Sequence, residues 1–181
     1  MIKTEILKIK GEWSEVLDAC RATVSKKFLN KEPSKEFKKA LVICEHSPLR
    51  TIWVKWRWQG LPSYIATHFA RHHIGFEKWI STQRNDRQDN YDRTKAPQDA
   101  MVSHIMYVNA QELMFMSRRR LCTLADKFTR SVMTEICRQV VIVCPEFEDK
   151  FEPMCFYRGG RCTEFNCCGF NKTYKEYEAD E

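Results

Sequence analysis

The chain has 181 residues and a mass of 21.5 kDa, so its length predicts one domain that can bury about two thirds of the surface exposed on unfolding. Hydrophobic residues make up 43% and charged residues 30% of the sequence, which excludes disordered, collagen-like and low-complexity chains. No apolar run reaches the roughly 18 residues of a membrane span, and the N-terminus lacks the pattern of a signal peptide. We therefore expect a cytoplasmic protein with no membrane partner.

Charge is distributed unevenly along the chain. The net charge is +6, but residues 174–181 carry one lysine and four acids, so residues 1–173 carry +9. A surplus of this size predicts a polyanionic ligand: a nucleotide, a phosphorylated cofactor or nucleic acid. The nine cysteines are an odd number, which in a chain without an export signal indicates reduced thiols rather than a disulfide framework.

Apolar periodicity predicts two strands and three helices in the first 72 residues. The clearest strand is 51–59, where Trp56 and Trp58 share the apolar face and Lys55 and Arg57 share the other with Trp53. Ser34 is a candidate helix N-cap. The expected strands span 5–10 and 51–59, and the expected helices span 13–25, about 34–45 and about 63–72.

The second half is predicted to be mainly helical. Residues 81–95 are almost wholly polar and are expected to form a strand end and a solvated loop. Pro97 is expected to open one long helix, and Thr123 with Asp126 suits a capping box for another that ends before Pro145. The tail, 145–181, is irregular, rich in cysteine and finally acidic. The predicted class is α+β, a small antiparallel sheet packed with long helices in a single domain, 1–181. The apolar stripe of the expected long helix is Met101, Ile105, Val108, Leu113 and Met116.

Two basic clusters are candidates for binding an anion. Arg71-His72-His73 lies at a predicted helix end, with Ser81, Thr82 and Arg84 a short spacer later, and such groups can fork onto phosphate or a flat ring. The alternative is a solvated basic helix end that offsets the helix dipole.

The second cluster is Arg118-Arg119-Arg120, which is followed ten residues later by Arg130. These side chains can converge on one anion across a helix–helix turn, or they can form an ordinary charged face. The turn Glu45-His46-Ser47-Pro48 offers a hydroxyl and backbone N–H groups at the sheet edge, and alone it is an ordinary turn.

The cysteines fall into two sets. One set lies on apolar helix faces and is expected in the core. The other set lies mostly in the tail, where spacings unlike those of a zinc ribbon leave structural zinc as an alternative to plain thiols. We expect no metal. The expected core set is Cys20, Cys44, Cys137 and Cys144, and the other set is Cys122, Cys155, Cys162, Cys167 and Cys168.

Taken in order, these segments resemble the flavin-dependent thymidylate synthases. The hallmark of that family is Arg-His-Arg, seven residues, then Ser, and here Arg71-His72-His73 is followed after seven residues by Ser81. The family's His-Ser/Thr-Pro turn is matched by His46-Ser47-Pro48. Its Leu-Arg and Ala-Gln-Trp-Glu-Ile-Arg segments are matched at Arg120, Ala125 and Arg130, and its Pro-x-Cys…Gly-x-Cys…Cys-Gly tail at Pro153-Met154-Cys155, Gly160-Arg161-Cys162 and Cys168-Gly169. The resemblance covers nearly the whole chain.

The resemblance implies the flavin-dependent thymidylate synthase-like fold and a homotetramer with sites between subunits. It implies reductive methylation of dUMP to dTMP, with FAD as cofactor, NADPH as reductant and methylenetetrahydrofolate as carbon donor, and no nucleic acid partner. The implied FAD-binding residues are Ser47, Arg71, His72, His73 and Arg120. The implied residues for the pyrimidine deoxynucleotide monophosphate are His68, Ser81, Thr82, Gln83, Arg84 and Arg130, with Arg130 also catalytic because it would stabilise negative charge on the ring oxygens.

This sequence departs from the family pattern mainly on the nucleotide side. The third hallmark residue is His73, the family's Ser-x-Arg-Tyr is one residue longer at 81–84, and Asp126 replaces an amide. Asp126 could accept from the exocyclic amine of cytosine, which uracil lacks. Two alternatives therefore stay open: one-carbon transfer, methylation or hydroxymethylation, to another pyrimidine nucleotide such as dCMP, and a non-enzymatic nucleic-acid-binding module built on tryptophans and basic residues.

Overall fold

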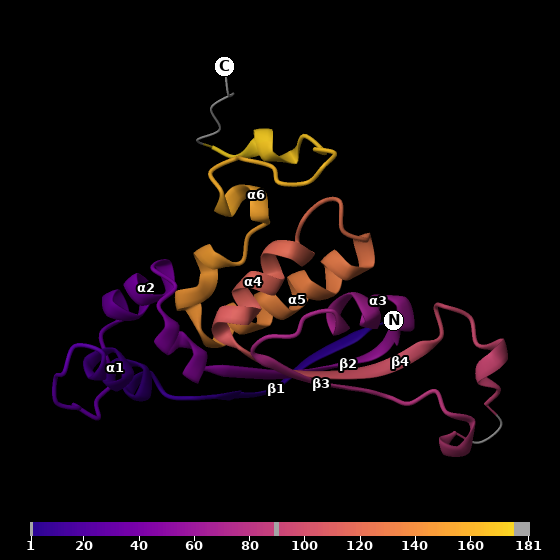
Figure 1. Ribbon diagram of the computed structural model, residues 1–181, viewed down its shortest axis with the longest axis horizontal. Helices are drawn as coiled ribbons and strands as arrows, with labels where there is room; N and C mark the ends of the chain where they lie inside the picture. Colours follow the sequence, from indigo (N-terminus) through magenta and orange to yellow (C-terminus); the bar gives the residue numbers. More distant parts are fainter. Residues whose placement is uncertain (1, 89–90, 176–181) are drawn as a thin grey trace.

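The computed structural model describes residues 2–88 and 91–175 as four strands, six α-helices and short 3-10 turns (Figure 1). None of its helices is long and apolar enough to cross a membrane. The strands are β1 (Lys3–Lys10), β2 (Trp53–Pro62), β3 (Phe76–Ile80) and β4 (Met101–Asn109). The helices are α1 (Trp13–Ala22), α2 (Lys35–Ile43), α3 (Ser63–Ala70), α4 (Ala110–Arg120), α5 (Lys127–Val143) and α6 (Met154–Tyr157).

The strands form one antiparallel sheet in the order β1-β2-β4-β3. Side chains alternate across it, so Val54, Trp56 and Trp58 of β2 point to one face and are buried. Helices α3, α4 and α5 cover that face, and Figure 1 shows them on the same side of the strands. A second cluster of buried residues joins α1 and α2 to the start of β2 and to α4. The predicted α+β class with a small antiparallel sheet is confirmed.

One buried group in this core is poorly matched to its surroundings. His104 of β4 is fully buried against Trp58, with ring centroids 5.6 Å apart, and neither ring nitrogen has a hydrogen-bond partner. Burial, with Lys78 nearby, lowers the pKa of His104 to about 4. Below about pH 6.5 the unfolded chain binds a proton at His104 that the folded chain excludes. His104 therefore lowers the free energy of unfolding progressively as the pH falls below about 6.5, and it has no such effect above that pH.

We expect His104→Phe to stabilise the protein by about 1–3 kcal/mol at neutral pH, because it removes unpaired buried nitrogens while it preserves the ring. The substitution is also expected to flatten the fall in unfolding free energy between pH 6.5 and 4. Urea denaturation at several pH values measures both effects. An unchanged pH profile would show that His104 does not titrate in this range.

The long helix predicted from Pro97 is wrong in its first part. Residues 101–109 are β4, and only Ala110–Arg120 is helical. The stripe through Met101, Ile105 and Val108 fits a helix by coincidence, whereas the buried residues alternate in steps of two, at Val102, His104, Met106 and Val108. The helix begins where the Asn109 side chain accepts a hydrogen bond from the Glu112 N–H at 2.9 Å.

Smaller differences concern boundaries and burial. The first helix ends at Ala22 rather than Ser25, and the helix before the basic cluster ends at Ala70. Asp126 alone caps α5, accepting from the Phe128 and Thr129 N–H groups, while the Thr123 hydroxyl lies 2.7 Å from the Cys168 sulfur. Residues 85–87 and 93–95 of the predicted loop form 3-10 turns. Residues 89–90 of this loop, and the acidic end, 176–181, lie outside the described residues.

The cysteine predictions hold in part. All nine cysteines are free in the structure. Cys137 is buried and Cys20 and Cys144 are partly buried, but Cys44 is exposed because it caps the end of α2 instead of lying on its packed face. In residues 2–88 and 91–175, no group of three or more His, Cys, Asp or Glu side chains is arranged to hold a metal ion.

Candidate functional site

The predicted hallmark residues occupy the turn between α3 and β3. Arg71 is the C-cap of α3 and is exposed, His72 is buried, and His73 is exposed. Gly75, with φ of +70°, lets the chain turn into β3, and a Cβ there would lie 2.2 Å from the Asn109 side-chain nitrogen. The turn is therefore held against the first residues of α4.

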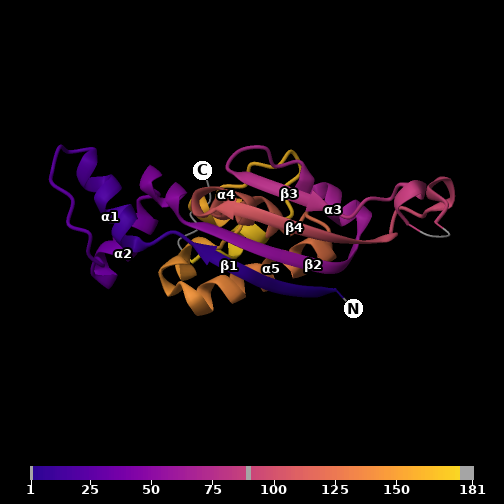
Figure 2. The ribbon, with the colours of Figure 1, turned by 90° about the horizontal axis from the view of Figure 1, so that it is seen from below.

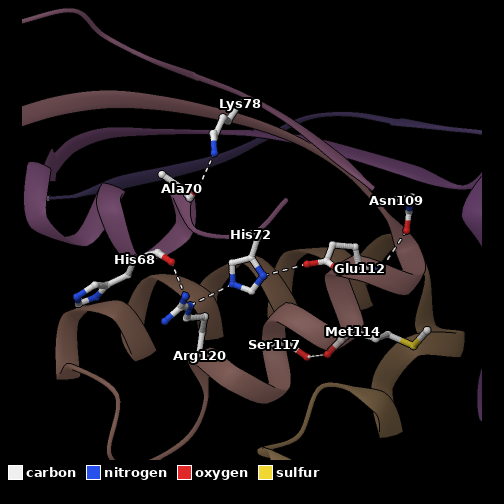
Figure 3. Close-up of polar contacts among 9 residues, drawn as sticks. All are labelled: His68, Ala70, His72, Lys78, Asn109, Glu112, Met114, Ser117 and Arg120. Carbon is white, nitrogen blue, oxygen red and sulfur yellow. Dashed lines mark hydrogen bonds and ion pairs between the residues drawn. The ribbon is translucent and has the colours of Figure 1, made fainter. Parts of the chain in front are cut away.

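His72 connects the turn after α3 to helix α4, because both of its ring nitrogens contact side chains of α4 (Figure 3). Its Nδ1 lies 2.9 Å from a carboxylate oxygen of Glu112, and its Nε2 lies 3.2 Å from Nε of Arg120. Because an arginine N–H can only donate, Nε2 of His72 accepts, and Nδ1 therefore carries the proton that it donates to Glu112. The Arg120 guanidinium also donates to the backbone carbonyl of His68. Helix α4 thereby fixes both the ring orientation of His72 and the end of α3.

A cavity of about 530 Å³ opens beside this network. It brings together four of the five predicted FAD-binding residues, namely Arg71, His72, His73 and Arg120. Its lining contains three arginines, two histidines and two glutamates. Glu112 contacts His72, and Glu164 contacts Arg119. The other lining residues are Ile74, Glu112, Phe115, Arg119, Cys122, Leu124, Ala125 and Glu164.

The electrostatics of this cavity favour an anion. Burial, followed by the nearby charges of Arg71 and Arg119, lowers the pKa of Arg120. Burial, followed by the nearby charges of Arg120 and Arg71, lowers the pKa of His68. The Nδ1 atom of His68 lies 2.9 Å from the Thr129 hydroxyl. Like charges held this close repel one another unless an anion binds between them. The cavity thus has the charge and the flat cationic groups that suit a phosphate-bearing ligand.

Four of the six predicted nucleotide residues lie in a second cavity of about 270 Å³, at the other end of α3. Ser81, Thr82, Gln83 and Arg84 line it together with Ser63 and Thr67 of α3. The Arg84 guanidinium is held at 2.7 Å by Asp86, and the Ser81 hydroxyl accepts a hydrogen bond from the Ser103 N–H at 3.0 Å. Within one chain, the predicted cofactor and nucleotide residues are thus separated along α3.

Three predicted site residues line neither cavity. Ser47 is exposed at the start of the 3-10 turn Ser47–Thr51, which precedes β2. Arg130 is partly buried in the second turn of α5, with its Nε unpaired. The side chain of His68 points toward α5 and contacts Thr129. Within this single chain, these three residues do not join the other predicted site residues at either cavity, and their roles stay predictions.

The arginine run does not converge on one anion, because its members point in different directions around α4. Arg118 is buried and forms an ion pair with Glu45. Arg119 lies 3.8 Å from Glu164 of the tail, and Arg120 contacts His72. Only Arg119 and Arg120 reach the larger cavity.

Comparison with known proteins gives a fold but no sequence family. No protein-family model matches the chain, and no curated protein matches it in sequence. The structure is similar to the crystal structure of a UMP/dUMP methylase, PolB from Streptomyces cacaoi, bound with 5-Br dUMP, with a TM-score of 0.66. The chain shares the fold of this methylase. The match covers 83% of this chain and 94% of the methylase chain at 12% sequence identity.

Glu112 is the site residue that the sequence analysis missed. Residues 101–116 were assigned to one helix, which gave no reason to place Glu112 opposite His72. The signal that could have identified it is Asn109, a good N-cap residue three positions before a glutamate.

We expect Glu112→Ala to weaken binding of the anionic ligand by about five- to a hundredfold, because it leaves the buried Nδ1–H of His72 without an acceptor. Glu112→Gln should restore most of the affinity, since the amide oxygen can still accept that proton. Nitrogen-15 chemical shifts of His72 would report the tautomer directly. Equal losses in both variants would contradict a role in orienting His72.

Proposed function

We propose that the chain is a flavin-dependent enzyme that transfers a one-carbon unit to a pyrimidine nucleotide, with methylation of dUMP to dTMP as its reaction. The observation that carries the proposal is the convergence of Arg71, His72, His73 and Arg120 on one cationic cavity, in a fold shared with a UMP/dUMP methylase. By resemblance, these residues correspond to the flavin anchor of the flavin-dependent thymidylate synthases, with His73 in place of the second arginine of its hallmark.

The residues of the larger cavity fit part of an FAD molecule. Its volume lies within the range of small-molecule sites, and its cations are not neutralised by the two glutamates in its lining. Arg71, His73 and Arg120 would hold the diphosphate, and the neighbouring Phe115 and Leu124 would provide apolar contact. FAD would supply the transfer of two reducing equivalents from NADPH. His72 would act by fixing Arg120 in place.

The nucleotide would bind at the smaller cavity. Its hydroxyl and guanidinium groups, Ser81, Thr82 and Arg84, are suited to a monophosphate. In the proposed reaction a bond forms between carbon 5 of the pyrimidine and the methylene carbon of methylenetetrahydrofolate, and the hydrogen on carbon 5 leaves as a proton. The bond between that carbon and the folate nitrogen then breaks, the nitrogen takes up a proton, and tetrahydrofolate leaves. A hydride equivalent that comes from NADPH completes the methyl group.

The separation of the two cavities along α3 suits a homotetramer whose sites form between subunits. In such an assembly, the flavin residues of one chain would meet the nucleotide residues of another. Arg130, which is partly buried in α5, would reach the pyrimidine from this second side.

The test is release of tritium from carbon 5 of labelled dUMP, UMP and dCMP in the presence of FAD, NADPH and methylenetetrahydrofolate. We expect release from dUMP together with formation of dTMP. Release from dCMP alone would replace dUMP by the cytosine nucleotide, and a product heavier by one oxygen would indicate hydroxymethylation. Absence of release from all three nucleotides would overturn the proposal.

A further inference from the structure

Within residues 2–88 and 91–175, no helix packs on the second face of the sheet. Figure 1 shows the helices that pack on the strands all on one side, and Figure 2, seen from below, shows the strands in front of those helices. The register places the outward side chains of all four strands on this surface, which we call the open face. Its aromatic and basic members are Trp53, Trp79, Tyr107, Lys8, Lys55 and Arg57, and its acidic members are Glu5 and Glu77.

The aromatic side chains of the open face present flat surfaces to solvent. The rings of Trp53 and Tyr107 lie side by side with centroids 4.9 Å apart, and Trp79 is 51% exposed. Lys55 holds its ammonium 5.5 Å from the centre of the Trp79 ring. An exposed ring with a cation beside it is the arrangement on which bases of single-stranded nucleic acids stack.

The charge of the open face is unbalanced. Lys8 and Lys55 are direct cross-strand partners, which is destabilising for two like charges. Lys3 and Lys10 extend the row along β1. Of the basic side chains on this face, Arg57 has an acidic partner, Glu5 at 2.9 Å. In residues 2–88 and 91–175, no carboxylate lies within ion-pair distance of the four lysines. A polyanion that crosses the strands would relieve this repulsion.

We propose that the open face binds single-stranded nucleic acid, with bases stacked on Trp79, Trp53 and Tyr107 and phosphates held by Lys8 and Lys55. A second copy of the chain is disfavoured, because two open faces packed together would oppose their lysine rows. The open face lies outside the two cavities, so binding of nucleic acid there would be a function separate from nucleotide methylation. It also departs from the sequence-based expectation of no nucleic acid partner.

The experiment is fluorescence anisotropy of labelled dT and U oligonucleotides of about 12 nucleotides, titrated with the full chain at several salt concentrations. Trp79→Ala should weaken binding by at least about fivefold, and Trp79→Phe should retain most of the affinity. Replacing both Lys8 and Lys55 by alanine should make the negative slope of log affinity against log salt concentration shallower by about 1.4. Lys31→Ala, which removes an exposed lysine elsewhere, should change neither quantity.

Three results would overturn the proposal. One is no binding of either oligonucleotide at low salt. Another is displacement of the oligonucleotide by saturating dUMP, which would place it in the nucleotide cavity. The last is sedimentation showing that the Lys8 and Lys55 substitutions dissociate an oligomer, which would assign the open face to a second copy. Because methylation is measured separately by tritium release, its failure would leave this test unaffected.

Discussion

Replacing Arg118 with alanine is expected to lower the free energy of unfolding by about 3 kcal/mol, the largest loss from any single side chain in the polar network of α4. Arg118 is 4% exposed, and its guanidinium forms two hydrogen bonds to the Glu45 carboxylate and lies 3.6 Å from the centre of the Tyr157 ring. Its loss would leave the partly buried Glu45 with only Lys150, at 3.3 Å, which places the effect at the low end for a broken buried pair.

Urea denaturation of wild type and variant measures this loss, and Arg119→Ala is the matched control. Arg119 is exposed, and it forms an ion pair at 3.8 Å with Glu164, so its removal should change stability by about 0.5 kcal/mol or less. In the double variant with Glu45→Gln, part of the lost stability should return, because the uncompensated charge is gone. Equal stability of the two single arginine variants would contradict the structural role of Arg118.

Replacing Arg71 with alanine is expected to weaken FAD binding by about ten- to a hundredfold, the value of a lost hydrogen bond to a charged group. Arg71 is exposed and lies in the larger cavity, so its removal should leave the stability of the fold nearly unchanged. Quenching of flavin fluorescence on titration with protein measures the affinity.

The control for this prediction is Arg158→Ala, which removes an exposed arginine at the end of α6. It should bind FAD as the wild type does. If Arg71→Ala also binds FAD with unchanged affinity, the flavin anchor lies elsewhere and the assignment of the larger cavity is wrong.

The sequence was sufficient to predict the strand expected at 51–59 and the helix pattern around it, although the strand begins at Trp53 and continues past Gly60 to Pro62. Its alternation was regular, and the burial of Trp56 and Trp58 confirms that face. Residues 101–109 were assigned wrongly because methionine and isoleucine happened to fall at helical spacing as well. Short apolar segments are ambiguous in this way, and only pairing with β2 and β3 decided for a strand.

The candidate site was predictable where it follows the chain and not where it depends on folding. Arg71 and His72 are adjacent in sequence at the end of a predicted helix, so their proximity could be predicted without knowledge of the fold. The partnership of His72 with Glu112 and Arg120 depends on how α4 lies against the turn that follows α3, which spacing along the chain does not reveal. The arginine run was misleading for the same reason, because direction around α4 decides that Arg118 is structural while Arg120 reaches the cavity.

We propose that the larger cavity holds a flavin and that a nucleotide bound at the smaller cavity of a neighbouring subunit lies beside it. This proposal is tested most directly by the visible absorbance spectrum of the protein after incubation with FAD and removal of free cofactor, followed by titration with dUMP. We expect a retained flavin spectrum that shifts on addition of dUMP. A colourless protein that takes up no FAD would contradict the account.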